Sequence, residues 1–522
     1  MRELLKAAQM RACDEYTSDY FGIDSAVLME RAALATFISI CNCGKMYEDT
    51  KTLVVCGTGN NGADGLALTR ILYESGYACD YCIPFKEGKK SELFKRQLST
   101  LLKYEINETD INDISGKYDI IVDAVFGIGL SRNLSKETAD FIEKLNCEDA
   151  FRVSMDIPSG INADSGTLMG NAFKADLTVT FAFAKPGLLL YPGKKYAGKL
   201  LIANIGITGD SLKCLKGSPV AKIMEREDLI KNLPKRNRDG NKGTFGKVLI
   251  YAGSEQISGA CVLSCLGALK SGAGMVKAIT NPANADIIKK TVPEAMVTTI
   301  NPDSDKETAD KIKEDISWCD VIVAGPGIGT DDTSEKLLYS LLETACNKPV
   351  VIDADGLNTI SRSARLQETI KNREGFTVFT PHMGELSRLT KISVDELKAD
   401  IIKKAGEYAG KMGICLVAKD AVSTVCYNGE SVLIDAGNDG MATAGSGDVL
   451  SGIMGAMMAN KSAEKTDCFA AVLNAVYLHG MAGNACLSDM ASDSITAGDI
   501  FLALPKVIKD IRDEQNELEE NI

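Results

Sequence analysis

Short runs of β-branched and aliphatic residues alternate along the chain with longer stretches whose apolar residues recur at helical spacing. This alternation is typical of βαβ units built around a mostly parallel sheet. The runs predict strands in the first half at 52–56, 78–83, 119–124, 152–156, 177–183 and 200–205. Those in the second half include 248–252, 276–280, 321–325, 350–353, 377–380, 414–418 and 424–427.

A polar, basic passage at 231–243 has neither a helical nor a strand period, and a new apolar run follows it. Because 522 residues are too many for one hydrophobic core, more than one domain is expected. We therefore predict two three-layer α/β domains, residues 1–215 and residues 225–510. The charged tail after Pro505 is expected to be a solvated helix end or disordered.

The composition narrows the class of protein. A net charge of −13 argues against a nucleic-acid partner. The sixteen cysteines are scattered, several of them within apolar runs, which fits reduced thiols in a cytosol better than a secreted disulfide scaffold. The N-terminus has no signal-peptide core, and no apolar stretch is long enough to cross a bilayer. We expect a cytoplasmic protein without a membrane partner.

The segment 441–450 carries the most chemistry. Gly445 and Gly447 bracket a serine directly before Asp448, and an apolar helical pattern follows. Glycines let backbone N–H groups surround an anion, and the start of a helix adds its positive end. Asp448 is then placed to take a proton from a substrate hydroxyl. The arrangement suits phosphoryl transfer; the alternative is a glycine-rich turn capped by an aspartate.

A second glycine-rich segment follows the first predicted strand of the chain. The glycines of 57–62 match the Gly-x-Gly-x-x-Gly dinucleotide fingerprint, which is a weak pattern by itself. The adjacent run Asn60-Asn61-Gly62-Ala63-Asp64-Gly65 offers two carboxamides and an acid as ligands for an ion and a sugar-phosphate. Ordinary turn chemistry is the alternative, because Asn, Asp and Gly tolerate left-handed backbone.

Further polar residues stand where later strands of the first half end. Asp123 precedes a glycine loop at 127–129, Asp156 and Ser159 end the next strand, and Lys185 follows another. Each is by itself more typical of a cap or turn. Since ligands of open α/β sheets bind at the carboxyl edge of the strands, the succession indicates one shared site.

The second half repeats this arrangement at 325–329, 351–356, 380–385 and 419–423. His382 is not expected to bind a metal, because no ligand cluster surrounds it in the sequence. It is interpreted either as a residue that hydrogen-bonds substrate or as the first residue of a helix. The segment from Lys419 to Ser423 holds nucleotide phosphate or ribose, or else is a hairpin turn.

Residues 51–206 resemble the NAD(P)H-hydrate epimerase domain through the Asn-Asn-Gly-x-Asp-Gly, Val-Asp-Ala-x-Phe-Gly and Asp-Ile-Pro-Ser-Gly motifs. The resemblance implies a Rossmann-like fold in which Asp156 and Lys185 are the acid/base candidates. Ala63 stands where the family usually has glycine, which is expected to restrict the loop. The implied potassium ligands are Asn61, Asp123 and Ser159; the implied substrate-binding residues are Asn60, Asn61, Gly62, Ala63, Asp64, Gly127, Ile128, Gly129, Leu130, Ser131, Arg132, Asn133 and Asp156.

Residues 230–505 resemble the ribokinase-like fold and, within it, the ADP- or ATP-dependent NAD(P)H-hydrate dehydratases. The resemblance is carried by 243–248, 271–274, 324–329, 381–385 and 442–448, whereas Asn241 replaces a histidine frequent in the family. The family pattern assigns Ala260, Gly327, His382 and Asp448 to the hydrated nucleotide. It assigns Lys419, Asp420, Ala421, Val422, Ser423 and Gly447 to ADP, with Mg²⁺ offsetting charge.

Together the two resemblances imply a bifunctional repair enzyme for the hydrates of NADH and NADPH (NADHX and NADPHX). The first domain would interconvert the R and S epimers, and the second would dehydrate the S epimer with ADP, or with ATP. A homo-oligomer is also implied. The alternatives are a vitamin or sugar kinase fused to a nucleotide-binding domain, a first half that binds without turnover, and a dehydrogenase.

Overall fold

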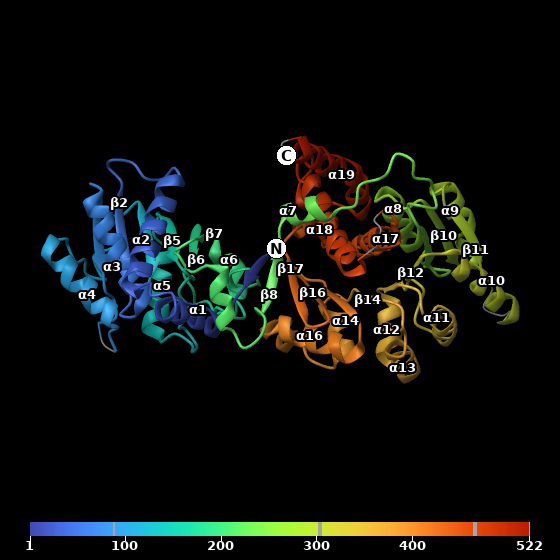
Figure 1. Cartoon of the computed structure of the whole chain (residues 1–522), viewed down its shortest axis with the longest axis horizontal. Helices are drawn as coiled ribbons and strands as arrows, with labels where there is room; N and C mark the ends of the chain where they lie inside the picture. Colours follow the sequence, from blue (N-terminus) through green and yellow to red (C-terminus); the bar gives the residue numbers. More distant parts are fainter. Residues whose placement is uncertain (87–88, 301–304, 463–466, 521–522) are drawn as a thin grey trace. The chain divides into compact units, whose positions relative to one another are not determined.

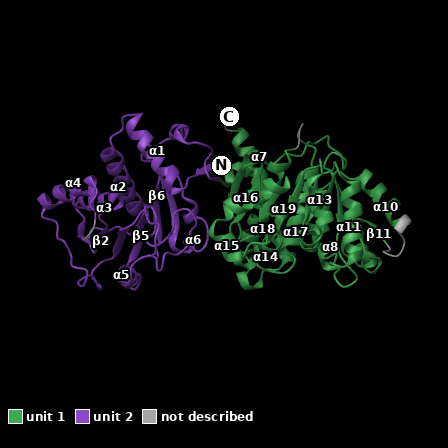
Figure 2. Cartoon of the chain, turned by 90° about the horizontal axis from the view of Figure 1, so that it is seen from below, with its two compact units in different colours: residues 1, 222–522 green, residues 2–221 purple. Residues whose placement is uncertain are grey.

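The computed structural model describes residues 1–86, 89–300, 305–462 and 467–520. These form two compact units, residues 2–221 and residues 222–522 together with Met1 (Figures 1 and 2). Each unit is a sheet covered by helices, so the predicted α/β class is confirmed. No helix in the described ranges is both long and apolar enough to span a membrane.

The sheet of residues 2–221 is parallel throughout, with the strand order β3-β2-β4-β5-β6-β7. All the strands predicted for the first half are present, and their ends differ from the prediction by at most two residues. The strands are β2 (Lys51–Cys56), β3 (Ala78–Cys82), β4 (Ile120–Ala124), β5 (Phe151–Met155), β6 (Leu177–Phe181) and β7 (Lys199–Ala203).

Helices cover both faces of this sheet because its strands are apolar on both sides. Val54 and Cys56 pack with the buried residues of α2 and α3, whereas Leu53 and Val55 pack with those of α5. One face therefore carries α1 (Ala7–Asp19), α2 (Ser25–Asn42), α3 (Asn60–Glu74) and α4 (Glu92–Leu101), and the other α5 (Lys136–Asn146). A short helix α6 (Gly193–Ala197) and 3-10 turns at Leu102–Tyr104, Pro186–Leu188 and Gly209–Cys214 complete the unit.

The strand order reverses at β2, which has β3 on one side and β4 on the other. The chain therefore leaves β2 and β4 in opposite directions, and a crevice opens between the two departing segments. Gly57, directly after β2, lies so close to the segment after β4 that a Cβ atom there would be 2.0 Å from the carbonyl oxygen of Val125. Only glycine fits this position.

The sheet of residues 222–522 has the order β8-β17-β16-β15-β14-β13-β12-β9-β10-β11, and only β16 is antiparallel to its neighbours. Every strand named in the prediction is present within one residue. Three further strands, β8, β11 and β17, were not predicted. The sequence signals of the first two are weak, since β8 borders the polar passage and β11 is partly exposed. The strands are β8 (Ala221–Met224), β9 (Lys247–Tyr251), β10 (Met275–Thr280), β11 (Met296–Thr299), β12 (Val321–Ala324), β13 (Val350–Ile352), β14 (Thr377–Phe379), β15 (Cys415–Ala418), β16 (Ser423–Tyr427) and β17 (Glu430–Ile434).

Two groups of helices flank this sheet (Figure 1). A continuous core joins one face of the sheet to α7 (Arg226–Asn232), α8 (Gly259–Lys270), α9 (Ala285–Thr291), α17 (Ser446–Ala459), α18 (Cys468–Cys486) and α19 (Ala497–Glu520). The remaining helices are α10 (Asp305–Trp318), α11 (Asp332–Thr344), α12 (Asp355–Arg362), α13 (Ala364–Lys371), α14 (Met383–Thr390), α15 (Val394–Ala399) and α16 (Ile401–Met412), with 3-10 turns at Pro282–Asn284, Asp439–Met441 and Ser492–Ser494.

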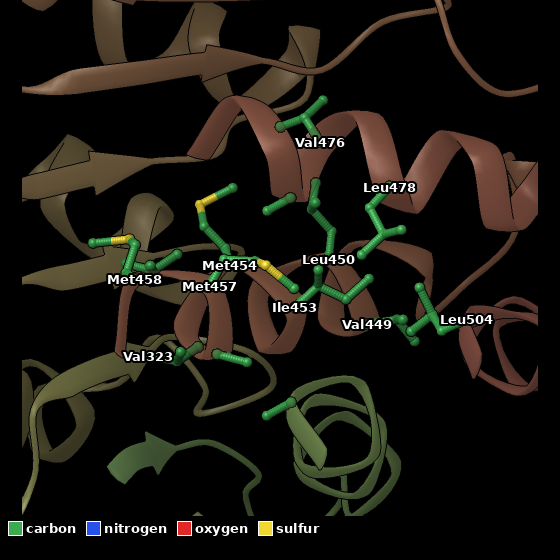
Figure 3. Packing of buried hydrophobic residues seen from close by; sticks show 14 of the residues in the cluster. Val323, Val449, Leu450, Ile453, Met454, Met457, Met458, Val476, Leu478 and Leu504 are labelled. Carbon is green, nitrogen blue, oxygen red and sulfur yellow. The ribbon is translucent and has the colours of Figure 1, made fainter. Parts of the chain in front are cut away.

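Helix α17 is the centre of that core. Apart from its first residues it has no exposed side, because every residue from Val449 to Ala459 is buried. Its side chains contact Val323 of β12 on one side and Val476, Leu478 and Leu504 of α18 and α19 on the other (Figure 3). The segment that carries Asp448 is therefore anchored by a helix that is buried along its length.

The charged C-terminal tail is helical to Glu520, so disorder is excluded for its described residues. Pro505 lies inside α19 without ending it, since Leu504, Val507 and Ile511 recur at helical spacing and are buried against the core. The prediction of a helix end is confirmed, and most of the residues from 509 to 520 are exposed or partly exposed, while Ile511 and Gln515 are buried. All sixteen cysteines, none of which lies in a gap of the description, are free thiols, as predicted.

Candidate active sites

A cavity of about 600 Å³ lies at the point where the strand order of residues 2–221 reverses. Its walls come from the start of α3, the segment after β4, and the ends of β5 and β6. Of the residues predicted for this site, those that line the cavity are Asn60, Asn61, Asp64, Gly127, Ile128, Gly129, Leu130, Ser131, Arg132, Asp156 and Lys185. Gly62, Ala63, Asn133, Asp123 and Ser159 are not among the lining residues.

The run from Asn60 to Gly65 is the first turn and a half of α3, so its interpretation as a loop or tight turn is wrong. Gly62 is required for packing, because a Cβ atom there would lie 1.7 Å from the carbonyl oxygen of Gly57. Ala63 is buried, and its N–H donates to the carbonyl of Gly59 at 3.1 Å. A methyl group is ordinary in a helix, so the expected restriction of a loop does not arise. Gly59, Asn60 and Asn61 at the helix start line the cavity, and the first N–H groups of a helix have no partner within it.

Asp123 forms a buried polar cluster behind the cavity wall. Its carboxylate accepts the hydroxyl of Ser159 at 2.6 Å and the N–H of Ser159 at 2.7 Å. Burial raises the pKa of Asp123 to about 6, against the lowering effect of these hydrogen bonds. The amide of Asn61 is also buried, and neither its nitrogen nor its oxygen has a partner in the described ranges. A buried group left unpaired in this way indicates a missing ligand such as an ion or water.

Asp156 and Lys185 form an ion pair at the cavity floor. Lys185 is 1% exposed, and its ammonium group donates to Asp156 Oδ1 at 2.6 Å, to Thr180 Oγ1 at 2.9 Å and to the carbonyl of Phe181 at 3.2 Å. The second carboxylate oxygen, Oδ2, lies 3.2 Å from the point where a Cβ atom of Gly127 would be. Glycine at this position leaves that oxygen open to the cavity. The sequence prediction that these residues share a site is therefore consistent with their positions.

The sequence interpretation missed Asp14 and Arg11, which line the same cavity from α1. Arg11 Nη2 donates to the carbonyl of Ile128 at 3.2 Å. Burial, followed by the charges of Glu15 and Asp156, raises the pKa of Asp14. Burial also raises the pKa of Asp64, with the charges of Asp156 and Asp14 adding to the effect. No strand-end or glycine signal marks α1, so only the tertiary fold identifies these residues.

In residues 222–522 the predicted polar segments meet at the carboxyl edge of the sheet. Backbone hydrogen bonds connect neighbouring strand ends: Asp353 N–H donates to Ala324, Thr380 N–H to Ile352, and Lys419 N–H to Pro381. The glycine loop after β12 belongs to the same edge. Gly325 has a φ of +123°, and a Cβ atom there would lie 2.0 Å from the carbonyl oxygen of Asp353.

Asp353, Lys419 and Ser451 form a hydrogen-bonded cluster beneath the start of α17. Lys419 Nζ donates to Asp353 Oδ1 at 2.8 Å, and Ser451 Oγ lies 2.8 Å from Asp353 Oδ2. Ser451 is also 3.0 Å from the carbonyl of Gly447. The sequence interpretation named 351–356 and Lys419 but missed Ser451, whose position one turn along an apolar helix gives no polar signal.

Asp448 stands on the first turn of α17, after Gly445 at a φ of +88°. Its carboxyl has no hydrogen-bond or ion-pair partner in the described part of the chain. Burial is the largest factor that raises its pKa to about 7; the charges of Asp353 and Asp355 add to the rise, and Lys419 opposes it. A group with this pKa is suited to accept a proton near neutral pH.

The remaining predicted residues occupy distinct places. A Cβ atom on Gly327 would lie 3.0 Å from that of Ala260, so these two are neighbours. His382 begins α14, and its Nδ1 accepts the N–H of Gly384 at 3.0 Å, which confirms the helix-start interpretation. Its Nε2 lies 3.5 Å from Glu385 Oε1, and the side chain as a whole is 56% exposed.

The segment 419–423 connects the antiparallel strands β15 and β16, which confirms the hairpin. Only Lys419 of this segment joins the cluster with Asp353. Asp420 pairs with Lys398 at 3.0 Å, Ala421 is exposed, and Val422 is buried, while Ser423 begins β16.

Asn241 and His479 also have defined contacts in this unit. Asn241, which replaces the histidine frequent in the family, accepts the N–H of Gly243 at 2.8 Å and so stabilises its own turn. His479 lies with Nε2 3.3 Å from Ser446 Oγ at the start of α17. Burial lowers the pKa of His479 to about 4, so the ring is neutral at physiological pH.

Comparison with known proteins covers both units. Residues 248–506 match the family model described as NAD(P)H-hydrate dehydratase, and residues 25–187 match that of the YjeF-related protein N-terminus. The bifunctional NAD(P)H-hydrate repair enzyme Nnr of Thermofilum pendens is 31% identical, over 98% of this chain and 97% of its own length. That of Coxiella burnetii is 32% identical, over 92% and 94%. A ribokinase-like superfamily protein from Enterococcus faecalis is 26% identical with a TM-score of 0.50, over 57% of this chain and 98% of its own.

Proposed function

Because the chain belongs to the family of bifunctional NAD(P)H-hydrate repair enzymes, we propose that it converts hydrated NADH and NADPH back to the intact dinucleotides. Residues 1–215 would interconvert the R and S hydrates, and residues 225–510 would dehydrate the S epimer. The single observation that carries this proposal is Asp448, a carboxyl at a glycine-rich helix start that has no partner among the described residues and a pKa of about 7.

In the dehydration step, Asp448 removes the proton from the ring hydroxyl of the hydrate. The resulting oxygen attacks the terminal phosphoryl group of the donor, and the bond between that phosphorus and the nucleotide oxygen breaks. N–H groups at Gly445 to Gly447 stabilise the developing negative charge. The ring nitrogen then expels phosphate, with loss of a proton from the neighbouring ring carbon, and the dihydronicotinamide is restored.

ADP is our preferred donor, with ATP as the alternative, and Lys419 to Ser423 with Gly447 would hold it. Among the described residues no group of three or more His, Cys, Asp or Glu side chains could hold a metal ion. This fits Mg²⁺, which binds mainly through nucleotide phosphates and water rather than through a dedicated protein cage. Ala260, Gly327 and His382 would contact the hydrated nucleotide.

In the epimerisation step, the hydrate would lie in the cavity against the lining residues of the segments 60–64 and 127–133 and against Asp156. A proton delivered from the Asp156–Lys185 pair allows the hydroxyl to leave as water, pushed by the ring nitrogen. Water then adds to the opposite face and returns a proton to the pair. The proposal is supported by Oδ2 of Asp156, which faces Gly127 in the cavity wall, and by the ammonium of Lys185, which bonds to the other oxygen of that carboxylate.

Asn61, Asp123 and Ser159 would hold a potassium ion. The donor set fits: the amide oxygen of Asn61 is buried and unpaired in the described ranges, and Asp123 supplies a buried carboxylate. Such an ion would supply positive charge near the phosphates of the substrate. A protein titrated with K⁺ and compared with its Asn61→Leu variant should show K⁺-dependent stabilisation that the variant lacks.

We further propose a homo-oligomer in the cytoplasm. Helix α2 exposes the apolar residues Val27, Leu34 and Ile38, each at least 46% exposed, whereas its other face is buried. The sixteen free thiols fit a reducing compartment. Light scattering of the protein and of its Leu34→Glu variant would test the assembly by comparing their masses in solution. Cell fractionation would test the location.

A vitamin or sugar kinase is not favoured, since relatives that match nearly the whole chain are repair enzymes. The deciding experiment mixes both hydrate epimers with the protein, ADP and Mg²⁺ and follows the absorbance of the reduced nicotinamide. Recovery of both epimers is expected. Absence of recovery with ADP and with ATP would refute the proposal, as would accumulation of a stable phosphorylated product.

A further inference from the structure

We propose that Asp353 is a positioning residue for dehydration: it holds the ammonium group of Lys419 under Gly447 and thereby sets the charge that faces Asp448. This inference rests on the proposed role of Asp448 as the base. It concerns a carboxylate that has no chemical step of its own.

The contacts of Asp353 show that its carboxylate is fully used within the protein. Oδ1 accepts from Lys419 Nζ at 2.8 Å and Oδ2 accepts from Ser451 Oγ at 2.8 Å. The residue is 1% exposed, and its backbone is bonded at both ends, to Ala324 and to Gly356. A buried carboxylate with both oxygens occupied is poorly placed to take a proton from substrate. Its function must therefore act through its partners.

Those partners lie directly beneath the first turn of α17. A Cβ atom on Gly447 would be 3.2 Å from Lys419 Nζ and 3.3 Å from Asp353 Oδ2. Ser451, one turn further along, lies within hydrogen-bond distance of both Gly447 and Asp353. The lysine, the acid and the helix start are thus one connected unit, and glycine at 447 leaves the space that the pair occupies.

The pair also determines the charge around the base. Asp353, Asp355 and Lys419 are the charged groups that act on Asp448. An ion pair between Asp353 and Lys419 places opposite charges side by side, so their effects on Asp448 largely offset one another. An ammonium group has three donors, and one is used by Asp353. Among the described residues Lys419 Nζ donates to Asp353 alone, so the lysine is held in place with donors left for the phosphoryl oxygens.

The test uses opposite charge changes and the pH profile of dehydration. Asp353→Asn leaves Lys419 uncompensated, which favours the ionised form of Asp448, so the acid limb should move down by about one pH unit. Lys419→Met should move the same limb upward. A double variant should return the limb toward its original position. Misplacement of Lys419 should lower kcat of Asp353→Asn by roughly 10–100-fold.

A matched control is available in the same unit. Lys277 Nζ lies 2.6 Å from Asp315 Oδ1, with side chains 16% and 5% exposed, against 22% and 2% for the Lys419–Asp353 pair. Asp315→Asn should destabilise the fold by a similar amount without moving the pH profile. Thermal unfolding of Asp315→Asn and Asp353→Asn separates a loss of stability from a misplacement of Lys419.

The outcomes distinguish the inference from the proposed function. If Asp448→Asn is inactive while Asp353→Asn and Lys419→Met leave the acid limb unmoved, the role of Asp353 is refuted and the base stands. If Asp448→Asn retains activity, the proposed function of that residue fails first. If Asp353→Asn does not fold, Lys419→Met still tests the charge balance, because its acid limb should move upward. An unmoved acid limb in Lys419→Met would overturn the inference.

Discussion

The two sites use the same residue types in different arrangements. In residues 2–221, Lys185 bonds directly to Asp156, the acid that faces the cavity. In residues 222–522, Lys419 bonds to Asp353, whereas Asp448 has no partner in the described ranges. In both, a residue with positive φ turns the chain sharply at the strand end: Asp156 itself at +67° and Ala354 at +50°.

The difference matches what each proposed reaction requires. Epimerisation gives a proton and takes it back, so an acid and an ammonium group in direct contact can exchange it. Dehydration needs a base that is free to accept a proton once, and a separate cation for the phosphoryl group. The location of the lysine relative to the acid, rather than the identity of the residues, therefore distinguishes the two sites.

The largest expected effect comes from removing the free base. Asp448→Asn should lower dehydration by ~10²–10⁴-fold, because the ring hydroxyl loses its proton acceptor. Exchange between the two epimers, which chromatography measures, should continue in this variant. The exposed acid Asp439, in the nearby turn Asp439–Met441, provides the control as Asp439→Asn. Dehydration within tenfold of the parent protein would contradict the assignment.

The site of residues 2–221, where lysine and acid pair directly, should be nearly as sensitive to the loss of Lys185 as the other site is to the loss of Asp448. Lys185→Met removes the donor to Asp156 and is expected to slow epimer exchange by about 10²-fold or more. With ADP present, conversion should then stall once the S epimer is consumed. Lys199→Met, which changes an exposed lysine at the start of β7, should convert the mixture fully. Full conversion by Lys185→Met would show that the pair is not needed.

The unpaired base also predicts a pH dependence. Because the pKa of Asp448 is raised to about 7, kcat/KM for dehydration should fall as the pH drops through that value. One pH unit below, the rate should be about a tenth of its plateau, since only the ionised form accepts a proton. A rate that stays constant down to pH 5 would exclude Asp448 as the titrating base.

The smallest expected effect concerns Ala63, where the family usually has glycine. Since Ala63 is helical and buried, Ala63→Gly should lower the free energy of unfolding by about 1 kcal/mol. Chemical denaturation measures this, with Ala139→Gly in α5 as a calibration for the same exchange in another helix. A gain in stability would show that the helical backbone at this position is strained.

Much of the fold follows from the sequence because buried parallel strands are short, apolar and separated by helical patterns. The strand ends then bring Asp156, Lys185, Asp353 and Lys419 to the sheet edges. The sequence predicts a turn at the start of α3 because Asn60 and Gly62 favour turns locally, whereas the close packing of Gly62 against Gly57 depends on the tertiary structure.

The residues that sequence reasoning missed share one property. Asp14 lies on a helix far along the chain from the strand ends, and Ser451 is enclosed by apolar neighbours on α17. Neither belongs to a pattern that the sequence repeats. Their roles follow from which helix covers which strand end, and that is decided by packing over the whole unit.

Burial of α17 on every side has a consequence for how this chain can change over generations. A surface helix tolerates many substitutions, but each position from Val449 to Ala459 is enclosed by other side chains. A smaller residue there would leave a cavity and a larger one would strain its neighbours, and both disturb the helix whose first turn carries Asp448. Variation among descendants of this sequence should therefore be rare along α17 and concentrated in helices that have a solvated face.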